Sequence, residues 1–239
     1  MGPARRTMEV ALTTALLIDG AAVDPVKSVR DLGIYIDSDL VIRTHVKRTV
    51  SRYFAAFRQL RQIHRSVPPA TFPSLVVTLV LSRLDYRNAV LVGLPAYLVR
   101  RLQSVLNAAA RLIYRMRSAD HVTDALACLH WLRVPERIEY YKVAVLTYKV
   151  LHGSAPRYLG PLVAVADLPG RRTLRSGGTK RLMVPSVRRS TVSDRAFMVA
   201  GPRVWNTLPE ETTTSQTLST FRQRLKTWLF RKSYPDIII

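Results

Sequence analysis

The sequence holds few of the residues from which disulfide frameworks and metal sites are built. It has one cysteine, Cys128, in 239 residues, which excludes a disulfide within the chain and a zinc site made of several cysteines. We interpret Cys128 as a small buried hydrophobe on a helix. Acidic residues number only 16, no two aspartates are adjacent, and the single adjacent pair of acids is Glu210 and Glu211. These two follow Pro209, where they suit the N-terminus of a helix.

The sequence also lacks an apolar run long enough to span a bilayer. Near the N-terminus, Val10 to Ile18 follows Arg5 and Arg6 and resembles a weak signal peptide, but Glu9 and Asp19 bracket it tightly. A buried strand explains this run more simply. We therefore expect no transmembrane segment, and a nuclear or cytoplasmic location rather than secretion.

Patterns for hydrolytic or nucleotide chemistry are missing as well. Cys128 and His130 cannot pair as nucleophile and base, because residues two apart do not face each other on a helix. Gly177 to Lys180 lacks the spaced glycines of a Walker loop. We interpret His130, beside Trp131, as structural. The five histidines are not spaced as metal ligands, either among themselves or relative to Cys128. They are His45, His64, His121, His130 and His152.

Positive charge is what the chain has in excess. Lys and Arg number 37, the formal net charge is +21 and the pI is near 11.1, while 48% of the residues are hydrophobic. The apolar content is enough for a folded core. Such a charge requires a polyanion or counterions, and the dense phosphates of nucleic acid are the first candidate. An anionic membrane surface is the second, less favoured because the excess runs through the whole chain.

Residues 10–42 are predicted to form strands. A hairpin with an Asp-Gly turn is expected from Leu16 to Ile18, Asp19-Gly20 and Ala21 to Val23. A second extended stretch is expected over Val29 to Ile36, where Gly33 indicates a bulge or the close approach of another backbone. Asp37 to Asp39 end this stretch, and for Asp37 and Asp39 a turn or helix cap is favoured over a metal site.

From about Thr44 the apolar period becomes helical. One face of this first helix consists of Val46, Val50, Phe54, Phe57 and Leu60. No acid occurs between Val41 and Ser66. We expect Phe54 and Trp228 in the core, and leave open whether Tyr53 packs there or stacks on bases. The opposite face is basic and consists of Lys47, Arg48, Arg52, Arg58, Arg61 and Arg65.

Further helices are predicted from about Pro73 to Val90, from Pro95 to Met116, over Thr123 to Leu129, and from Pro135 to a C-terminal cap at Gly153. Residues 167–203 are predicted to be irregular, with nine Lys or Arg and a short strand over Leu182 to Val184. A last helix begins at about Leu218. The fold class is therefore mainly α, with a small N-terminal β element. We expect three parts: 1–42, 43–165 and 166–239.

Blocks distributed over nearly the whole chain from Leu16 have a familiar order and spacing. They resemble the C-terminal region of the reverse transcriptase of non-LTR (LINE-type) retrotransposons, downstream of its active site. The blocks are LLIDGAAVDPVKSVRDLGIYIDSDL (16–40), SRLDYRNAVLVGLP (82–95), RLQSVLNAAARLIYR (101–115), LHWLRVPERIEYYKVAVLTYKVLHGSAPRYL (129–159), DRAFMVAGPRVWNTLP (194–209) and FRQRLKTWLF (221–230).

This resemblance implies a primer-grip hairpin in 1–42, a thumb-like helical bundle in 43–165 and a basic C-terminal extension in 166–239. The family's polymerases hold two metal ions with a carboxylate triad that includes an Asp-Asp pair, and this chain has no such pair. We therefore expect no catalytic and no metal-binding residue, no enzyme activity by the chain itself and no cofactor. Mg²⁺ would belong to a palm upstream of residue 1.

The implied partners are RNA or an RNA–DNA hybrid bound without sequence specificity and, as a further candidate, the upstream polymerase domain. A thumb holds a template–primer duplex by its phosphates. Charge and helix face, rather than the resemblance, select the candidate contacts: Lys47, Arg48, Arg52, Arg58, Arg61, Arg100, Arg101, Arg171, Arg172, Lys180 and Arg181. Two alternatives remain open: a helical module that binds a protein or a membrane surface, and a relic open reading frame without function.

Overall fold

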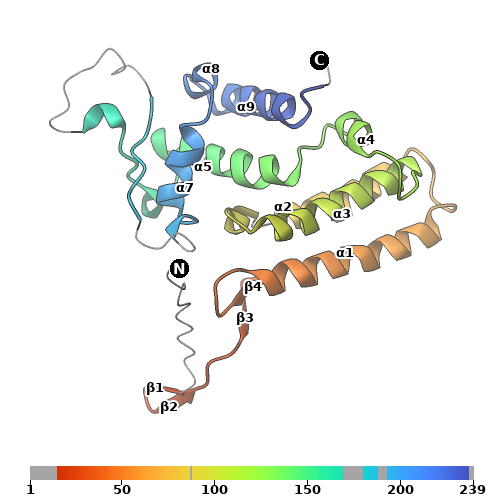
Figure 1. Cartoon of the computed structure of the whole chain (residues 1–239), viewed down its shortest axis with the longest axis horizontal. Coiled ribbons are helices and arrows are strands. Elements are labelled where there is room, and N and C mark those ends of the chain that lie inside the picture. The colour runs from red at the N-terminus through yellow and green to blue at the C-terminus, as the bar shows by residue number, and fades with distance from the viewer. Residues whose placement is uncertain (1–14, 87, 169–179, 188–192, 237–239) are drawn as a thin grey trace, which may run out of the picture. The chain divides into compact units, whose positions relative to one another are not determined.

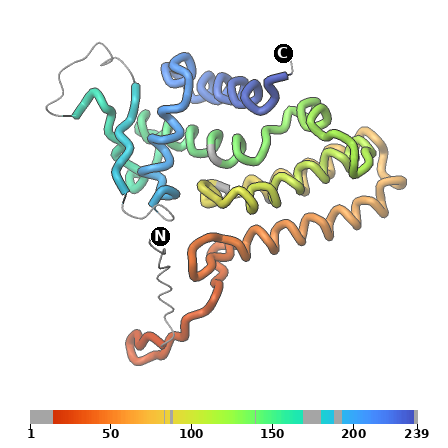
Figure 2. Tube along the Cα trace, viewed as in Figure 1, coloured from red at the N-terminus to blue at the C-terminus, as the bar shows by residue number. Residues whose placement is uncertain are grey.

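The chain divides into two compact units, residues 1–45 and 46–239. Figures 1 and 2 colour the chain by residue number, from red near the N-terminus to blue near the C-terminus. The computed structural model describes residues 15–86, 88–168, 180–187 and 193–236. Most of these residues are helical, and the strands are confined to the N-terminal unit apart from an isolated bridge. The predicted fold class, mainly α with a small N-terminal β element, is confirmed.

The first hairpin forms where the sequence predicted it. Strand β1 (Leu16–Ile18) pairs antiparallel with β2 (Ala21–Val23), with Leu16 opposite Val23. Both turn residues have positive φ, 50° at Asp19 and 81° at Gly20. An Asp-Gly pair tolerates these angles and matches the twist of the flanking strands, which is why the dipeptide marks this turn.

The expectation of one extended stretch over Val29 to Ile36 is wrong. The segment is a second hairpin, in which β3 (Ser28–Asp31) pairs antiparallel with β4 (Ile34–Asp37). Gly33, with φ of 88°, lies in its turn rather than in a bulge, and Leu32 beside it also has positive φ, 45°. A branched residue seldom adopts this conformation, so Leu-Gly gives a much weaker turn signal than Asn-Gly.

The hairpins expose much of their apolar surface. The exposed fraction is 77% at Leu17, 51% at Val29 and 69% at Leu32. The buried strand expected over residues 10–18 is therefore wrong at Leu16–Ile18, all three of which are exposed, and residues 10–14 lie outside the described part of the chain.

The remaining elements are helices. In chain order they are α1 (Arg43–Ile63), α2 (Phe72–Asp85), η1 (Asn88–Leu91), α3 (Ala96–Tyr114), α4 (Thr123–Cys128), η2 (Glu136–Lys142), α5 (Val143–Leu151), η3 (Arg157–Leu159), η4 (Val165–Asp167), α7 (Phe197–Trp205), α8 (Glu210–Thr213) and α9 (Leu218–Ser233). Figure 1 shows α2 beside α3, and α5 beside α7 and α9, in agreement with their close backbone contacts.

The buried stripe of α1 differs from the predicted one at two positions. Val46, Phe57 and Leu60 are buried as expected, but Val50 is only half-buried, and Phe54 is 39% exposed with Tyr53 buried in its place. The Tyr53 hydroxyl donates a hydrogen bond to the carbonyl oxygen of Val80 in α2, at 3.0 Å. Placing Phe54 in the core was therefore wrong, because Tyr53 can bury its ring and still satisfy its polar group.

An aromatic cluster joins the helices of the C-terminal half. Phe221 of α9 is completely buried and stacks on Tyr148 of α5, with 4.5 Å between ring centroids, and on Trp205 of α7, at 5.7 Å. The polar atoms of its neighbours are satisfied, because the Tyr148 hydroxyl donates to Ser215 O and Trp205 Nε1 donates to Lys180 O. Three helices thus share one core.

Helix α7 was not predicted, since residues 167–203 were expected to be irregular. A Cβ atom at Gly201 would lie 3.0 Å from the Thr147 hydroxyl oxygen of α5, so the glycine permits close approach of the two helices. The strand expected over Leu182 to Val184 is reduced to one bridge between Ala164 and Leu182. Gly201 and Pro202 lie inside α7, and both residue types disfavour a helix, so the local sequence does not predict one. Packing of α7 on α5 overrides this low helix propensity.

Replacing Phe221 by alanine should lower the free energy of unfolding by about 3–5 kcal/mol, because the substitution leaves a cavity between three helices. Urea unfolding followed by circular dichroism measures the change. Phe54→Ala is the matched control at an exposed position of α1 and should cost about 1 kcal/mol or less. Equal losses in the two variants would contradict this account of the core.

Alkaline pH should weaken the fold through Tyr234. This residue is 2% exposed, and its hydroxyl donates to Trp131 O at 2.6 Å. Burial raises the pKa of Tyr234 to about 12, although nearby Arg133 acts in the opposite direction. The unfolded chain, whose tyrosines titrate near pH 10, then releases this proton first, so the contribution of Tyr234 to stability falls as the pH rises from about 10 to about 12.

Urea unfolding of the wild type and of Tyr234→Phe at a series of pH values from 9 to about 12 tests this expectation. The advantage of the wild type over Tyr234→Phe should be constant below the ordinary tyrosine pKa and shrink above it. A pH-independent difference would show that Tyr234 does not titrate as described.

Candidate functional site

The polar side of α1 is basic along its length. Helix α1 contains no acidic residue, and the five candidates selected from its sequence are all exposed. Its buried stripe faces α2 and the core, which leaves the charged side chains on the outer surface. These exposed residues, called the α1 basic face below, are Lys47, Arg48, Arg52, Arg58 and Arg61.

The other candidates lie on separate elements. Arg100 and Arg101 are exposed near the start of α3, and Lys180 and Arg181 are exposed on the segment that precedes α7. The backbone of that segment is held in place, because the carbonyl oxygen of Lys180 accepts from Trp205 and that of Arg181 accepts from Val165 N at 2.9 Å. Two further candidates, Arg171 and Arg172, lie outside the described residues.

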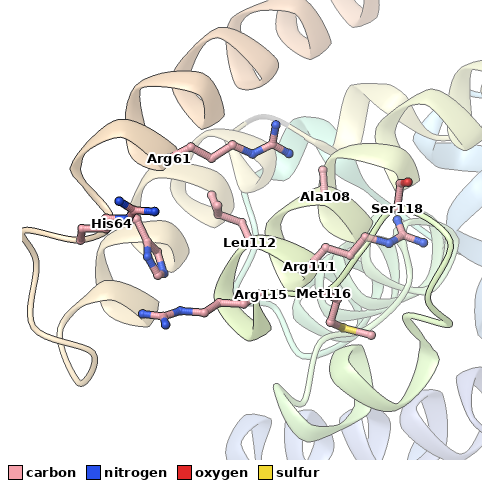
Figure 3. A pocket seen from close by; sticks show the side chains of 9 residues that line it. Arg61, His64, Ala108, Arg111, Leu112, Arg115, Met116 and Ser118 are labelled. Atoms are coloured by element: carbon pink, nitrogen blue, oxygen red, sulfur yellow. The ribbon is translucent and has the colours of Figure 1, made fainter.

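A pocket of about 570 Å³ lies where the C-terminal ends of α1 and α3 meet. Figure 3 shows Arg61 and His64 on the α1 side and Arg111 and Arg115 on the α3 side, with Leu112 between them. Four of the nine lining residues are arginines and none is acidic. The lining consists of Arg61, His64, Arg65, Ala108, Arg111, Leu112, Arg115, Met116 and Ser118.

Helix ends hold these side chains in place. Arg115 is the C-cap of α3, with φ of 54°, and its backbone N–H donates to Arg111 O. The Arg111 side chain is anchored in turn, because its Nη2 donates to Asp120 O at 3.1 Å. On the other side, the His64 ring meets the ring of Phe72 edge-on, with 4.2 Å between centroids. The pocket therefore has ordered walls.

The four guanidinium groups have no carboxylate partner in the described part of the chain. The ion pairs found there join Arg43 to Asp39, Arg137 to Asp85, and Arg203 to Asp194. In addition, Arg111 Nε is buried and makes no hydrogen bond to any described residue. Concentrated positive charge with an unsatisfied buried donor is a binding environment for an anion.

Sequence reasoning found only one of these four arginines as a candidate. Arg61 is among the candidates and Arg65 lies on the predicted basic face of the first helix, whereas Arg111 and Arg115 are not among the candidates. A local signal exists, because both pairs are four residues apart in the last turn of a helix or just beyond it. That the two helix ends meet depends on tertiary packing, which the local pattern does not contain.

The acids near the start of α1 have a structural role, as the sequence favoured. Asp37 Oδ2 accepts the Thr44 N–H at 2.9 Å, and Asp39 accepts the Val41 N–H at 3.1 Å. Asp39 also pairs with Arg43. Within the described ranges, no group of three or more His, Cys, Asp or Glu side chains is arranged to hold a metal ion.

Two further expectations about single side chains need correction. Cys128 lies on a helix as predicted, but its side chain is exposed rather than buried. Trp228 is only half-buried, and its ring packs edge-on against Tyr140, while Lys232 Nζ lies 5.2 Å from the Trp228 ring. His130 does have a structural contact, because its ring stacks on Phe230 with 5.7 Å between centroids.

The described helices include none with the length and apolar character needed to cross a bilayer. Comparisons of the chain with known protein families, with curated proteins and with solved structures give no match. The site's own charge and geometry are therefore the basis for assigning a function.

Proposed function

We propose that this chain binds nucleic acid through backbone phosphates, without reading base sequence. The observation that carries the proposal is the α1 basic face: a helix of 21 residues with exposed Lys and Arg side chains and no acid, ending at a pocket lined by four arginines. Phosphate contacts supply affinity and position on nucleic acid but carry no sequence information, which matches a surface made of charge alone.

The dimensions of the helix suit one side of a duplex. With a rise of about 1.5 Å per residue, Lys47 and Arg61 lie about 20 Å apart along α1. This distance is shorter than one turn of a duplex, about 34 Å. The α1 basic face would therefore follow the phosphates along one groove rather than encircle the duplex.

The natural substrate of such a surface is a template–primer. The resemblance of the sequence blocks to the thumb and C-terminal extension of a LINE-type reverse transcriptase, together with the helical fold, supports this assignment. In this proposal the chain is the part of an RNA-directed DNA polymerase that holds RNA or an RNA–DNA hybrid, and it lacks the carboxylates that would bind Mg²⁺ for nucleotide transfer.

Affinity for an RNA–DNA hybrid should fall steeply with salt, because each neutralised phosphate contributes roughly 0.7 to 0.9 to the slope of log K against log salt. The double variant Arg52→Gln, Arg58→Gln should therefore bind more weakly and reduce this slope by about 1.4 to 1.8. Fluorescence anisotropy with a labelled hybrid at several salt concentrations measures both quantities. A salt-independent affinity in the wild type would contradict binding through phosphates.

Arg222→Gln, Lys226→Gln provides a control with the same loss of charge on an exposed part of α9. Because charges separated by more than about 8 Å are largely screened at physiological salt, this variant should change the slope much less. Equal effects in both double variants would assign the affinity to net charge and not to α1. Binding to anionic vesicles that exceeds hybrid binding at equal salt would favour a membrane-surface module instead.

The chain alone should extend no primer. With Mg²⁺, deoxynucleotides and a labelled primer–template, we expect the primer to stay at its original length on a denaturing gel, because no carboxylate triad is present in the proposed arrangement. A complete reverse transcriptase run in parallel controls for the substrate. Extension that persists after further purification of the chain would overturn the non-catalytic part of the proposal.

A further inference from the structure

We propose that the pocket between the ends of α1 and α3 binds a phosphate group carrying more than one negative charge, such as the terminal phosphate of a nucleic-acid strand or an oligophosphate. The inference deepens the proposed function and rests on it, since Arg61 belongs both to the α1 basic face and to the pocket lining. It assigns the pocket a ligand different from the phosphodiesters along the outer face of the helix.

The charge of the pocket exceeds what a single phosphodiester neutralises. Four guanidinium groups line it, and the two helix C-termini contribute roughly half a negative charge each. About three positive charges are then left over. A phosphodiester carries one negative charge, whereas a terminal phosphate carries about 1.5 to 2 at neutral pH. A terminal phosphate or a pyrophosphate therefore matches the pocket better.

The donor geometry also suits phosphate oxygens. A guanidinium presents a planar fork of N–H groups that fits pairs of phosphate oxygens. Arg111 is held by its Nη2 bond to Asp120 O, while its Nε stays buried without a hydrogen bond to any described residue. The carboxylate of Asp120 is not among the ion pairs of the described residues, and its Oδ2 accepts the backbone N–H of Arg117 at 2.6 Å.

The volume allows more than a lone phosphate ion. At about 570 Å³ the pocket lies within the range of sites for small organic ligands, about 300 to 1,000 Å³. Part of its wall is apolar, made by Ala108, Leu112 and Met116. A sugar or base attached to the phosphate could lie against this wall. The end nucleotide of a strand would thus fit the pocket by both charge and size.

The test compares two oligonucleotides of identical sequence, one with a 5′-phosphate and one with a 5′-hydroxyl, each labelled at the 3′ end. Anisotropy titrations use the full chain at one salt concentration. We expect the phosphorylated strand to bind about tenfold more tightly, since charge-assisted hydrogen bonds are worth roughly one such factor. The preference should vanish in Arg61→Gln, Arg115→Gly.

Glycine is chosen at Arg115 because φ of 54° is a conformation that glycine adopts without strain, so the guanidinium is lost while the cap is kept. If the double variant has a different melting temperature from the wild type, the single variant Arg61→Gln, at an exposed site, replaces it in the comparison of the two strands. The control Arg52→Gln, Arg58→Gln removes the same charge from residues outside the pocket lining. It should weaken both strands alike and keep the preference.

A second measurement separates the two sources of the phosphate. Calorimetric titration with inorganic pyrophosphate should give binding in the wild type and none in the pocket variant. If pyrophosphate binds in this way but the two oligonucleotides bind equally, the site takes a free oligophosphate.

If both strands bind equally and pyrophosphate gives no heat, the pocket proposal is overturned, while salt-dependent binding of the strands would leave the proposed function intact. If neither strand binds, the proposed function fails, and the pyrophosphate result alone decides the pocket.

Discussion

Tyr148, Trp205 and Phe221 come from α5, α7 and α9, and their stacking with Phe221 at the centre is the contact on which the larger unit depends. A chain with a formal net charge of +21 repels itself, so its apolar contacts must offset that repulsion as well as the conformational entropy of folding. Completely buried aromatic rings contribute the most per residue. The polar groups of Tyr148 and Trp205 bind backbone carbonyls, which fixes how the segments around the stack meet.

This arrangement explains how charge can concentrate elsewhere. Because the core lies among helices whose buried stripes are apolar, basic side chains can be placed on the opposite surfaces without being desolvated. At α1 they form an exposed face without acidic residues. Where α1 and α3 end together, four arginines share one pocket with no described carboxylate to balance them. Mutual repulsion at this point is a cost to stability that an anionic ligand would relieve.

Helix positions and the first hairpin were predictable because their signals are local: an Asp-Gly turn, apolar residues three and four apart, and Pro or Gly at helix ends. Gly153, expected as a cap, does adopt positive φ after α5. The second hairpin, with a leucine in its turn, and α7, with Gly201 and Pro202 inside, lack such signals. The exposed basic residues of α1 followed from helical periodicity. The meeting of Arg61 and Arg65 with Arg111 and Arg115 did not, because it depends on contacts between residues far apart in sequence.

The contacts that complete the core have a consequence for synthesis in the cell. The hydrogen bond between Tyr148 and Ser215 joins residues 67 apart in sequence, and that between Trp131 and Tyr234 joins residues 103 apart. Neither bond can form until the later residue has been synthesised. Translation proceeds from the N-terminus, so the cationic helix α1 emerges from the ribosome long before the residues that close the hydrophobic core. The nascent chain therefore passes ribosomal RNA while its basic side chains and its apolar helix faces are both exposed to solvent. The core can therefore close only after residues 215–234 have been synthesised, and until then α1 is exposed to capture by the same class of polyanion that the folded chain is proposed to bind.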